Sequence, residues 1–402
     1  MHPPYSLYLH IPFCIHRCAY CDFNTYAGLE SLIEPYTQAL VQEIEYSGQS
    51  AAAYHGGSPL PLHTVFFGGG TPSLLPAAGL AQILQAIRRA YELSPQAEIS
   101  LEANPGTLSL EVLQQLHALG VNRLSLGMQS ANPEELQFLE RQHGLQDVIH
   151  ACGWARQAGL ENFNLDLIFG LPGQSLESWQ ASLDTALTLR PPHLSLYALT
   201  IEHGTPLAHR VANGLVSEPD PDLAAEMYEH AQEKLAVVGY TQYEISNWAL
   251  PSTSGLLSCR HNLQYWRGLP YLGLGAGAHG YAAAQRSVTV LAPAAYIQRL
   301  AAARTAPLSF PRTPASSEIR VLTPQDELGE YMMMRLRLVQ EGVPEDEFQA
   351  RFGHTLEETF PNQIRRLLQT GLIEWNAAPG GRCLRLAPRA YLLGNRVFRE
   401  FI

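Results

Sequence analysis

The chain has 402 residues, 46% of them hydrophobic, and a formal net charge of −11 at pH 7. Its length predicts two or three domains, and its apolar fraction is sufficient for a large core. The acidic balance argues against nucleic acid as a partner, because binding to phosphates needs clustered basic residues.

Three of the six cysteines lie close together near the N-terminus, after a short apolar run that predicts a strand. Cys14, Cys18 and Cys21 have the spacing C-x3-C-x2-C. A strand that ends in a tight loop can turn three thiolates toward one point, which suits an iron–sulfur cluster. A [4Fe–4S] cluster held by three thiolates leaves one iron open, and the amine and carboxylate of S-adenosylmethionine (SAM) can chelate that iron.

Two other interpretations stay open on spacing alone. A zinc site would need a fourth ligand, for which His10 and His16 are candidates, although this spacing is not typical of zinc. The three cysteines can also be buried structural residues that cluster by chance.

The segment YLHIPFCIHRCAYC resembles the start of radical SAM proteins. In particular, it resembles the branch that contains oxygen-independent coproporphyrinogen III oxidase and HemW-type haem chaperones. In such proteins one electron delivered to the cluster cleaves bound SAM to a 5'-deoxyadenosyl radical. The resemblance therefore implies a [4Fe–4S] cluster, SAM, and a reductant as a partner.

Strand-like and helix-like segments alternate after the cysteines, which predicts a parallel sheet. The expected strands are the first apolar run and residues 63–67, 98–102, 123–126, 162–168 and 193–197. The expected helices lie near 76–91, 109–119, 133–158 and 175–189. The fold class is therefore α/β, a partial (β/α)6 barrel whose functional residues lie at the carboxyl ends of the strands.

Polar or glycine residues follow these strands at the expected positions. Glycines 68–70 and Thr71 follow the second strand, and Glu102, Gln129 and Asp166 end later strands. Each alone can be a turn or capping residue. By resemblance, the SAM-contacting positions are Gly69, Gly70, Thr71, Glu102, Gln129, Arg141 and Asp166, with Tyr8 beside the cluster and Thr200 as a weaker member. The family usually has glycine where this chain has Glu140.

A second set of candidate ligands lies in the segment RHNLQYW. In a helix, His261 and Tyr265 share one face, and both side chains can ligate haem iron. A histidine beside aromatic residues is more often a packing residue. The pattern H-N-x-x-Y-W, however, matches the haem-binding segment of HemW-type proteins, and some oxidase relatives carry a similar one.

After about residue 290 the alternation of predicted strands and helices gives way to a different pattern. Helices are expected over 322–339 and 355–369, followed by a hairpin with its turn at 379–381, which predicts a C-terminal α+β module of winged-helix type. The predicted domains are a radical SAM partial barrel at 1–200, a barrel-completing segment with the haem motif at 201–290, and the C-terminal module at 291–402.

The sequence predicts a haem chaperone that binds haem and a SAM-ligated cluster and transfers haem to acceptor proteins. The alternative is the oxidase of the same branch, which usually has a longer N-terminal extension and a further cysteine where this chain has Phe23. A third hypothesis, a simple electron carrier, does not explain the loop that resembles a SAM-binding segment or the polar residues at the strand ends. No residue is assigned a catalytic role, and whether SAM is cleaved stays open.

The cytoplasm is the expected compartment. No signal peptide is visible, no apolar run is long enough to span a membrane, and an oxygen-sensitive cluster needs reducing surroundings. Peripheral contact with a membrane stays open.

Overall fold

A computed structural model describes residues 4–253, 255–303 and 309–402 of the chain. The chain forms two compact units, each made of two segments. The first unit comprises Met1–Ala231 and Pro270–Arg320, and the second comprises Gln232–Leu269 and Val321–Ile402. The division into three consecutive domains stays a prediction.

The first unit is built on a sheet whose order is β16-β15-β14-β13-β1-β4-β5-β6-β7-β8. Neighbouring strands from β13 through β1 and β4 to β8 run parallel, whereas β13, β14 and β15 pair antiparallel. The bounds of the parallel strands are Tyr5–Ile11 (β1), Pro61–Gly69 (β4), Glu92–Ala103 (β5), Arg123–Gln129 (β6), Phe163–Phe169 (β7), His193–Ala198 (β8) and Tyr271–Leu274 (β13). The remaining strands are Phe13–Cys14 (β2), Tyr26–Ala27 (β3), His279–Ala282 (β14), Gln285–Thr289 (β15) and Ser316–Val321 (β16).

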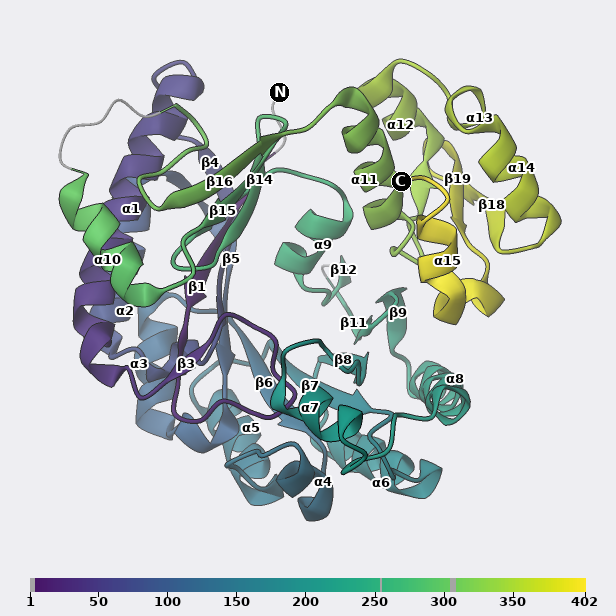
Figure 1. The fold of residues 1–402 in the computed structure, drawn as a ribbon, viewed down its shortest axis with the longest axis horizontal. Coiled ribbons are helices and arrows are strands. Elements are labelled where there is room, and N and C mark those ends of the chain that lie inside the picture. The colour runs from purple at the N-terminus through teal and green to yellow at the C-terminus, as the bar shows by residue number, and fades with distance from the viewer. Residues whose placement is uncertain (1–3, 254, 304–308) are drawn as a thin grey trace. The chain divides into compact units, whose positions relative to one another are not determined.

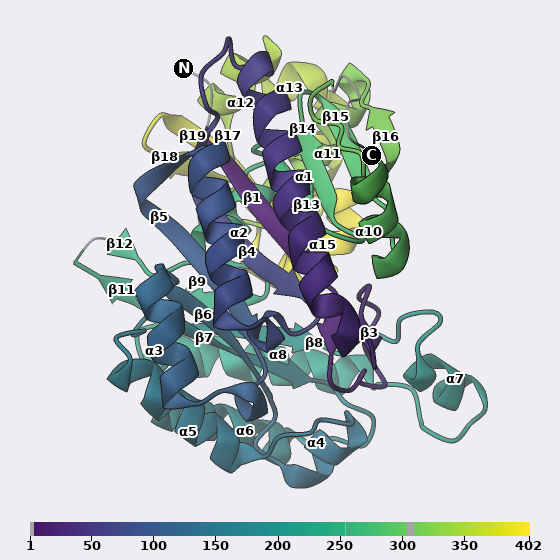
Figure 2. The same cartoon turned by 90° about the vertical axis from the view of Figure 1, so that its left-hand side faces the viewer.

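Helices connect the parallel strands and cover the sheet (Figures 1 and 2). Figure 2 shows α1 and α2 side by side in front of β1, β4 and β5. The helices are Ile33–Tyr54 (α1), Ala77–Ala90 (α2), Leu110–Leu119 (α3), Pro133–Phe138 (α4), Leu145–Gln157 (α5), Leu176–Thr188 (α6), Pro206–Ala212 (α7), Pro221–Val237 (α8, which crosses into the second unit) and Pro293–Ala302 (α10). Short 3-10 turns are Glu30–Leu32, Pro72–Leu74 and Pro105–Thr107. This arrangement confirms the predicted α/β fold with a parallel sheet.

Burial explains why the strands form where they do. Leu7, Leu9 and Ile11 of β1, like Leu165 and Leu167 of β7, are fully buried. Near-continuous apolar runs of this kind are typical of parallel strands covered on both faces. The strand ends are therefore fixed by a rigid core.

Two helical predictions were wrong in detail. The segment 133–158 is not one helix but two, α4 and α5, because the chain turns between them and Glu140 has a φ of 56°. The helix predicted over 355–369 is also two, Leu356–Thr359 (α13) and Pro361–Gln369 (α14), because proline begins the second.

The second unit contains the predicted C-terminal module. Its three-stranded sheet has the order β17-β19-β18, in which β18 and β19 form the predicted hairpin. Helices α11, α12 and α14 pack their apolar residues into one core with this sheet. The elements of the unit are Thr241–Glu244 (β9), Asn247–Ala249 (β10), Pro251–Ser252 (β11), Gly255–Leu256 (β12), Arg260–Trp266 (α9), Pro324–Arg335 (α11), Val343–Pro344 (β17), Glu345–Phe352 (α12), α13, α14, Ile373–Ala378 (β18), Gly381–Leu386 (β19), the 3-10 turn Pro388–Leu393 and Gly394–Phe398 (α15).

None of the helices in the described parts of the chain is both long and apolar enough to span a bilayer.

Candidate functional site

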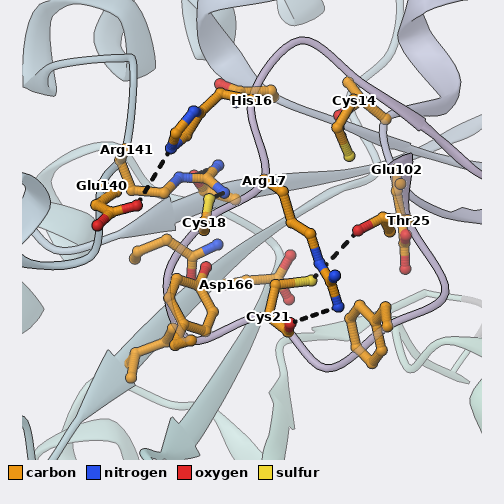
Figure 3. Close-up of a pocket in the computed structure, with 18 of the residues that line it drawn as sticks. Cys14, His16, Arg17, Cys18, Cys21, Thr25, Glu102, Glu140, Arg141 and Asp166 are labelled. Carbon is orange, nitrogen blue, oxygen red and sulfur yellow. Dashed lines mark hydrogen bonds and ion pairs between the residues drawn. The ribbon is translucent and has the colours of Figure 1, made fainter. Parts of the chain in front are cut away.

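The three clustered cysteines lie in a loop that closes on itself. β2 and β3 pair in parallel on either side of this loop, and the Cys21 N–H donates to the Cys18 carbonyl across 3.2 Å. Figure 3 shows the side chains of Cys14, Cys18 and Cys21 arranged around one space. They line a cavity of about 550 Å³ at the carboxyl ends of the strands. The structure therefore gathers the three predicted ligands.

The glycine run after β4 packs against the backbone of the cysteine loop. The Gly70 N–H donates to the Ile11 carbonyl and the Thr71 N–H to the Phe13 carbonyl, each across 2.8 Å. A Cβ on Gly70 would lie 2.6 Å from the Phe13 oxygen, and a Cβ on Gly69, whose φ is 111°, would lie 2.6 Å from the His10 ring. Glycine is required here by the close approach of two chain segments, and both residues also line the cavity.

Two partly buried carboxyl groups line the same cavity: Glu102 lies next to the end of β5, whereas Asp166 lies in the middle of β7 rather than at the predicted strand end. Glu102 accepts a hydrogen bond from the Gly69 N–H at 3.0 Å, and burial raises its pKa to about 7, with a further contribution from the charge of Asp166. Burial also raises the pKa of Asp166, which accepts hydrogen bonds from Ser125 and Asn164 at 2.9 and 2.7 Å. A cation in this cavity would favour their ionised forms.

Arg141 reaches the cavity because the chain turns between α4 and α5. Its Nη1 donates to the Cys18 sulfur at 3.6 Å and its Nη2 to the Gly127 carbonyl at 3.2 Å. Its Nε is buried and has no hydrogen-bond partner within the part of the chain that the structure describes. Gln129 lines the same wall with a φ of 64°, a conformation that costs energy for a residue other than glycine.

The residues that line the cavity fit a [4Fe–4S] cluster with a charged ligand bound beside it. All six cysteines lie in the described part of the chain and none forms a disulfide, and only the three in the loop line the cavity. Within the described residues, no group of three or more His, Cys, Asp or Glu side chains converges as the ligands of a single ion would. A [4Fe–4S] cluster does not need that convergence, because each thiolate binds a different iron. The unpartnered Arg141 Nε and the two partly buried acids, Glu102 and Asp166, leave polar groups that can bind a charged ligand beside the cluster.

Other predicted residues have protein partners. Tyr8 is partly buried, and its hydroxyl lies 2.9 Å from His10 Nδ1; of the described residues, it is not one that lines the cavity. The other nitrogen of His10 lies 2.9 Å from the Asn24 carbonyl. His16 Nε2 lies 3.3 Å from a carboxylate oxygen of Glu140 at the cavity rim (Figure 3). Thr200, the weaker candidate, does line the cavity.

Three residues that the structure places at the site were not predicted from the sequence. Thr25 has its hydroxyl 3.8 Å from the Cys21 sulfur. Ser125 and Asn164 orient Asp166 from neighbouring strands. Ser125 and Asn164 could have been found from their register, because β6 pairs Ser125 with Asn164 on β7. Thr25 carries no comparable signal.

The predicted haem ligands lie in the second unit, on helix α9 (Figure 1). His261 is buried, and its Nε2 lies 2.8 Å from the Tyr265 hydroxyl one turn later. The two rings meet edge to face with centroids 5.0 Å apart. The helix therefore brings the pair together as predicted, but in this arrangement each side chain is a partner of the other.

Two protein-family models match the chain, one in its N-terminal part and one in its C-terminal part. The radical SAM superfamily model matches residues 8–186, and the HemN C-terminal domain model matches residues 322–393. These ranges contain the cysteine loop with the cavity and the hairpin module, respectively.

Comparison with individual proteins gives matches along almost the whole chain. The heme chaperone HemW of Bacillus subtilis is 37% identical over 398 residues, which cover 99% of each chain. The heme chaperone HemW of Escherichia coli is 39% identical over 373 residues, which cover 92% of each chain. Among solved structures, the radical SAM enzyme coproporphyrinogen III oxidase (HemN) of Escherichia coli has a TM-score of 0.81 at 22% identity, covering 100% of this chain and 90% of that one. This last likeness shows the fold alone.

Proposed function

Because the chain belongs to the HemW family of the radical SAM superfamily, we propose that it is a haem chaperone that binds a [4Fe–4S] cluster, SAM and haem. It holds the cluster through Cys14, Cys18 and Cys21, and it passes haem to acceptor proteins. The observation that carries the cofactor part is that all three thiols line one cavity together with residues of β4, β5, β6 and β7. The bound cluster would supply one-electron chemistry at an iron that carries no protein thiolate.

The residues around the cavity have separable tasks toward SAM. Gly69 and Gly70 let the backbone approach closely, and Thr71 adds a hydroxyl. Glu102 and Asp166 complement the positive charges of the ligand, while Gln129 and the free Nε of Arg141 offer hydrogen bonds. Tyr8 acts indirectly by orienting His10.

Haem binding is proposed at helix α9. A neutral imidazole is a good axial ligand, and His261 would exchange its hydrogen bond with Tyr265 for the iron. We propose the cytoplasm as the compartment, where a reductant can reach the cluster and acceptor proteins can take up haem.

A haem titration tests this proposal. The protein is purified without oxygen, its cluster is reconstituted, and haem is added while the Soret band is followed. We expect a saturable stoichiometric complex that weakens at least about tenfold in His261→Ala, since one lost ligand bond exceeds 1.4 kcal/mol. His150→Ala is the control, because His150 is an exposed helical histidine that likewise contacts an aromatic ring one turn later, that of Trp154.

Two results would contradict the proposal. Haem binding that is absent, or equally tight in His261→Ala, removes the haem site from α9. Conversion of coproporphyrinogen III to protoporphyrinogen IX in the presence of SAM and a reductant would assign the chain the oxidase activity instead.

A further inference from the structure

Each of the three clustered sulfurs has one side-chain donor in hydrogen-bonding range. The Thr71 hydroxyl lies 3.7 Å from the Cys14 sulfur, and Arg141 Nη1 lies 3.6 Å from the Cys18 sulfur. The Thr25 hydroxyl lies 3.8 Å from the Cys21 sulfur. Thr71 and Arg141 were already candidates for the SAM site, whereas Thr25 has no assigned role.

The backbone around Thr25 is held from two sides. Its N–H donates to the Phe23 carbonyl at 2.8 Å, and the next N–H, of Tyr26, donates to the Pro12 carbonyl at 2.7 Å. On the other side, the Asn24 amide donates to the Ala276 carbonyl at 3.0 Å. With Thr25 itself buried, its hydroxyl is fixed beside the cysteine loop rather than turned toward solvent.

The Thr25 hydroxyl lies 3.8 Å from the Cys21 sulfur, which is within the range of a hydrogen bond to sulfur. A donor in this position stabilises negative charge on that sulfur, because hydrogen bonds to a charged acceptor are stronger than those to a neutral one.

A ligating thiolate can only accept hydrogen bonds, so next to the cluster Thr25 is necessarily the donor. Hydrogen bonds to the sulfurs are among the factors that set the reduction potential of an iron–sulfur cluster, because they stabilise the more negative, reduced state. We infer that Thr25 is a positioning residue of the cluster, whose hydroxyl donates to the ligating sulfur of Cys21 and raises the cluster's reduction potential. This inference rests on the proposed function, since it requires the cluster.

The test compares the reconstituted protein with two variants at Thr25. Thr25→Val removes the hydroxyl and keeps the shape, whereas Thr25→Ser keeps the hydroxyl. Thr37→Val is the matched control, because Thr37 is equally buried and its hydroxyl donates to the Ile33 carbonyl, away from sulfur. The reduction potential is measured by spectroelectrochemical titration, and iron and sulfide are counted for each protein.

We expect Thr25→Val to lower the ratio of reduced to oxidised cluster at a fixed potential about tenfold, which for one electron corresponds to 59 mV. Thr25→Ser and Thr37→Val should keep the wild-type potential. If Thr25→Val binds no iron while Thr25→Ser binds a full cluster, the hydroxyl is again the group required, which supports the inference.

Three outcomes overturn it. The first is an unchanged potential in Thr25→Val, and the second is a potential in Thr25→Ser displaced as far as in Thr25→Val. The third is loss of iron in both variants, which would make Thr25 a packing residue. Failure of the proposed function appears differently, because the wild-type protein itself would then take up no cluster.

Discussion

In the cavity, Cys14, Glu102, Arg141 and Asp166 come from separate segments of the chain and face an open volume of about 550 Å³. In helix α9, His261 and Tyr265 are one turn apart and hydrogen-bond to each other. Polar groups that surround an open cavity need a ligand to complete their hydrogen bonds. The buried Arg141 Nε, which has no hydrogen-bond partner within the described residues, is an example. A polar pair within one helix can satisfy itself.

The two proposed sites therefore rest on different kinds of evidence. The geometry of the cavity supports a cofactor independently of any motif. The haem site depends on the pattern H-N-x-x-Y-W and on the family, because the contacts of α9 alone are also those of a packed helix.

The largest effect is expected where the two cavity walls touch. In Gly70→Ala the new Cβ would lie 2.6 and 2.9 Å from the carbonyl oxygens of Phe13 and Ile11. The cysteine loop must move, at a cost of about 1–3 kcal/mol, so we expect the variant to fold but to lose most of its cluster iron. Iron analysis after anaerobic reconstitution measures this.

Gly153→Ala is the control for this variant, because nothing lies within 4 Å of a Cβ on Gly153 in α5. It should bind a full cluster. A full cluster in Gly70→Ala as well would show that the packing of the glycine run against the loop does not shape the cavity.

The next largest effect is expected from the partly buried carboxyl group of Glu102. Its pKa is about 7 in the folded chain against an ordinary 4.5, so the folded state holds this proton more tightly than the unfolded state does. The resulting loss of stability is absent below pH 4.5, grows as the pH rises to 7, and approaches on the order of 3 kcal/mol above pH 7, at about 1.4 kcal/mol for each pKa unit.

Glu102→Gln removes this penalty and also the charge that SAM would meet. Without SAM, the variant should melt at a higher temperature than the wild type at pH 8, with little difference at pH 4.5. SAM binding, measured by calorimetry on the reconstituted protein, should weaken at least about tenfold through loss of a charge-assisted contact. A melting difference that does not change with pH would refute the assignment of the raised pKa to Glu102.

Part of the site follows from sequence because its residues obey simple rules of spacing. The cysteine pattern and the residues at the ends of β4, β5 and β6 are found by counting from apolar runs, since parallel strands end at one edge of the sheet. The same counting predicts Asp166 at the end of its strand as well, but it lies in the middle of β7. The positive φ of Glu140 could not be found in this way, because the sequence pattern of 133–158 predicts one continuous helix. The turn at Glu140 divides that segment into α4 and α5, and it brings Arg141 to the cavity.

Helix α1 shows a second limit of prediction from sequence, because it is not among the helices that the sequence predicted. It is long, yet its buried face includes the polar residues Glu43 and Ser47 beside Leu40 and Ile44. The Glu43 carboxylate accepts hydrogen bonds from Tyr296 and Thr313, both at 2.6 Å, which lie far away in the sequence. The apolar periodicity is therefore weakened by groups whose partners only the fold reveals.

A smaller effect is expected at α9. Tyr265→Phe keeps the ring and removes the hydroxyl that occupies His261 Nε2. If His261 is the iron ligand, haem should bind as tightly or about two- to tenfold more tightly, because a competing hydrogen bond of about 0.5–1.5 kcal/mol is gone. If the hydroxyl of Tyr265 is the ligand, the haem titration will instead show weakening as large as that in His261→Ala. Tyr391→Phe, elsewhere in the second unit, serves as the control.

The smallest effect is expected at the cavity rim, at Glu140. Its φ of 56° is strained by roughly 1–2 kcal/mol in a residue with a Cβ. Glu140→Gly relieves that strain, but it loses the exposed pair with His16, worth about 0–1 kcal/mol, and adds about 0.4–1 kcal/mol of unfolded-state entropy. The free energy of unfolding should therefore change by no more than about 1 kcal/mol in chemical denaturation, with cluster content unchanged. Glu140→Ala loses the pair and keeps the strain, so it should be the less stable of the two. Equal stability of the two variants would mean that the backbone turn that delivers Arg141 is unstrained, and loss of iron in both would mean that the contact with His16 anchors the cysteine loop.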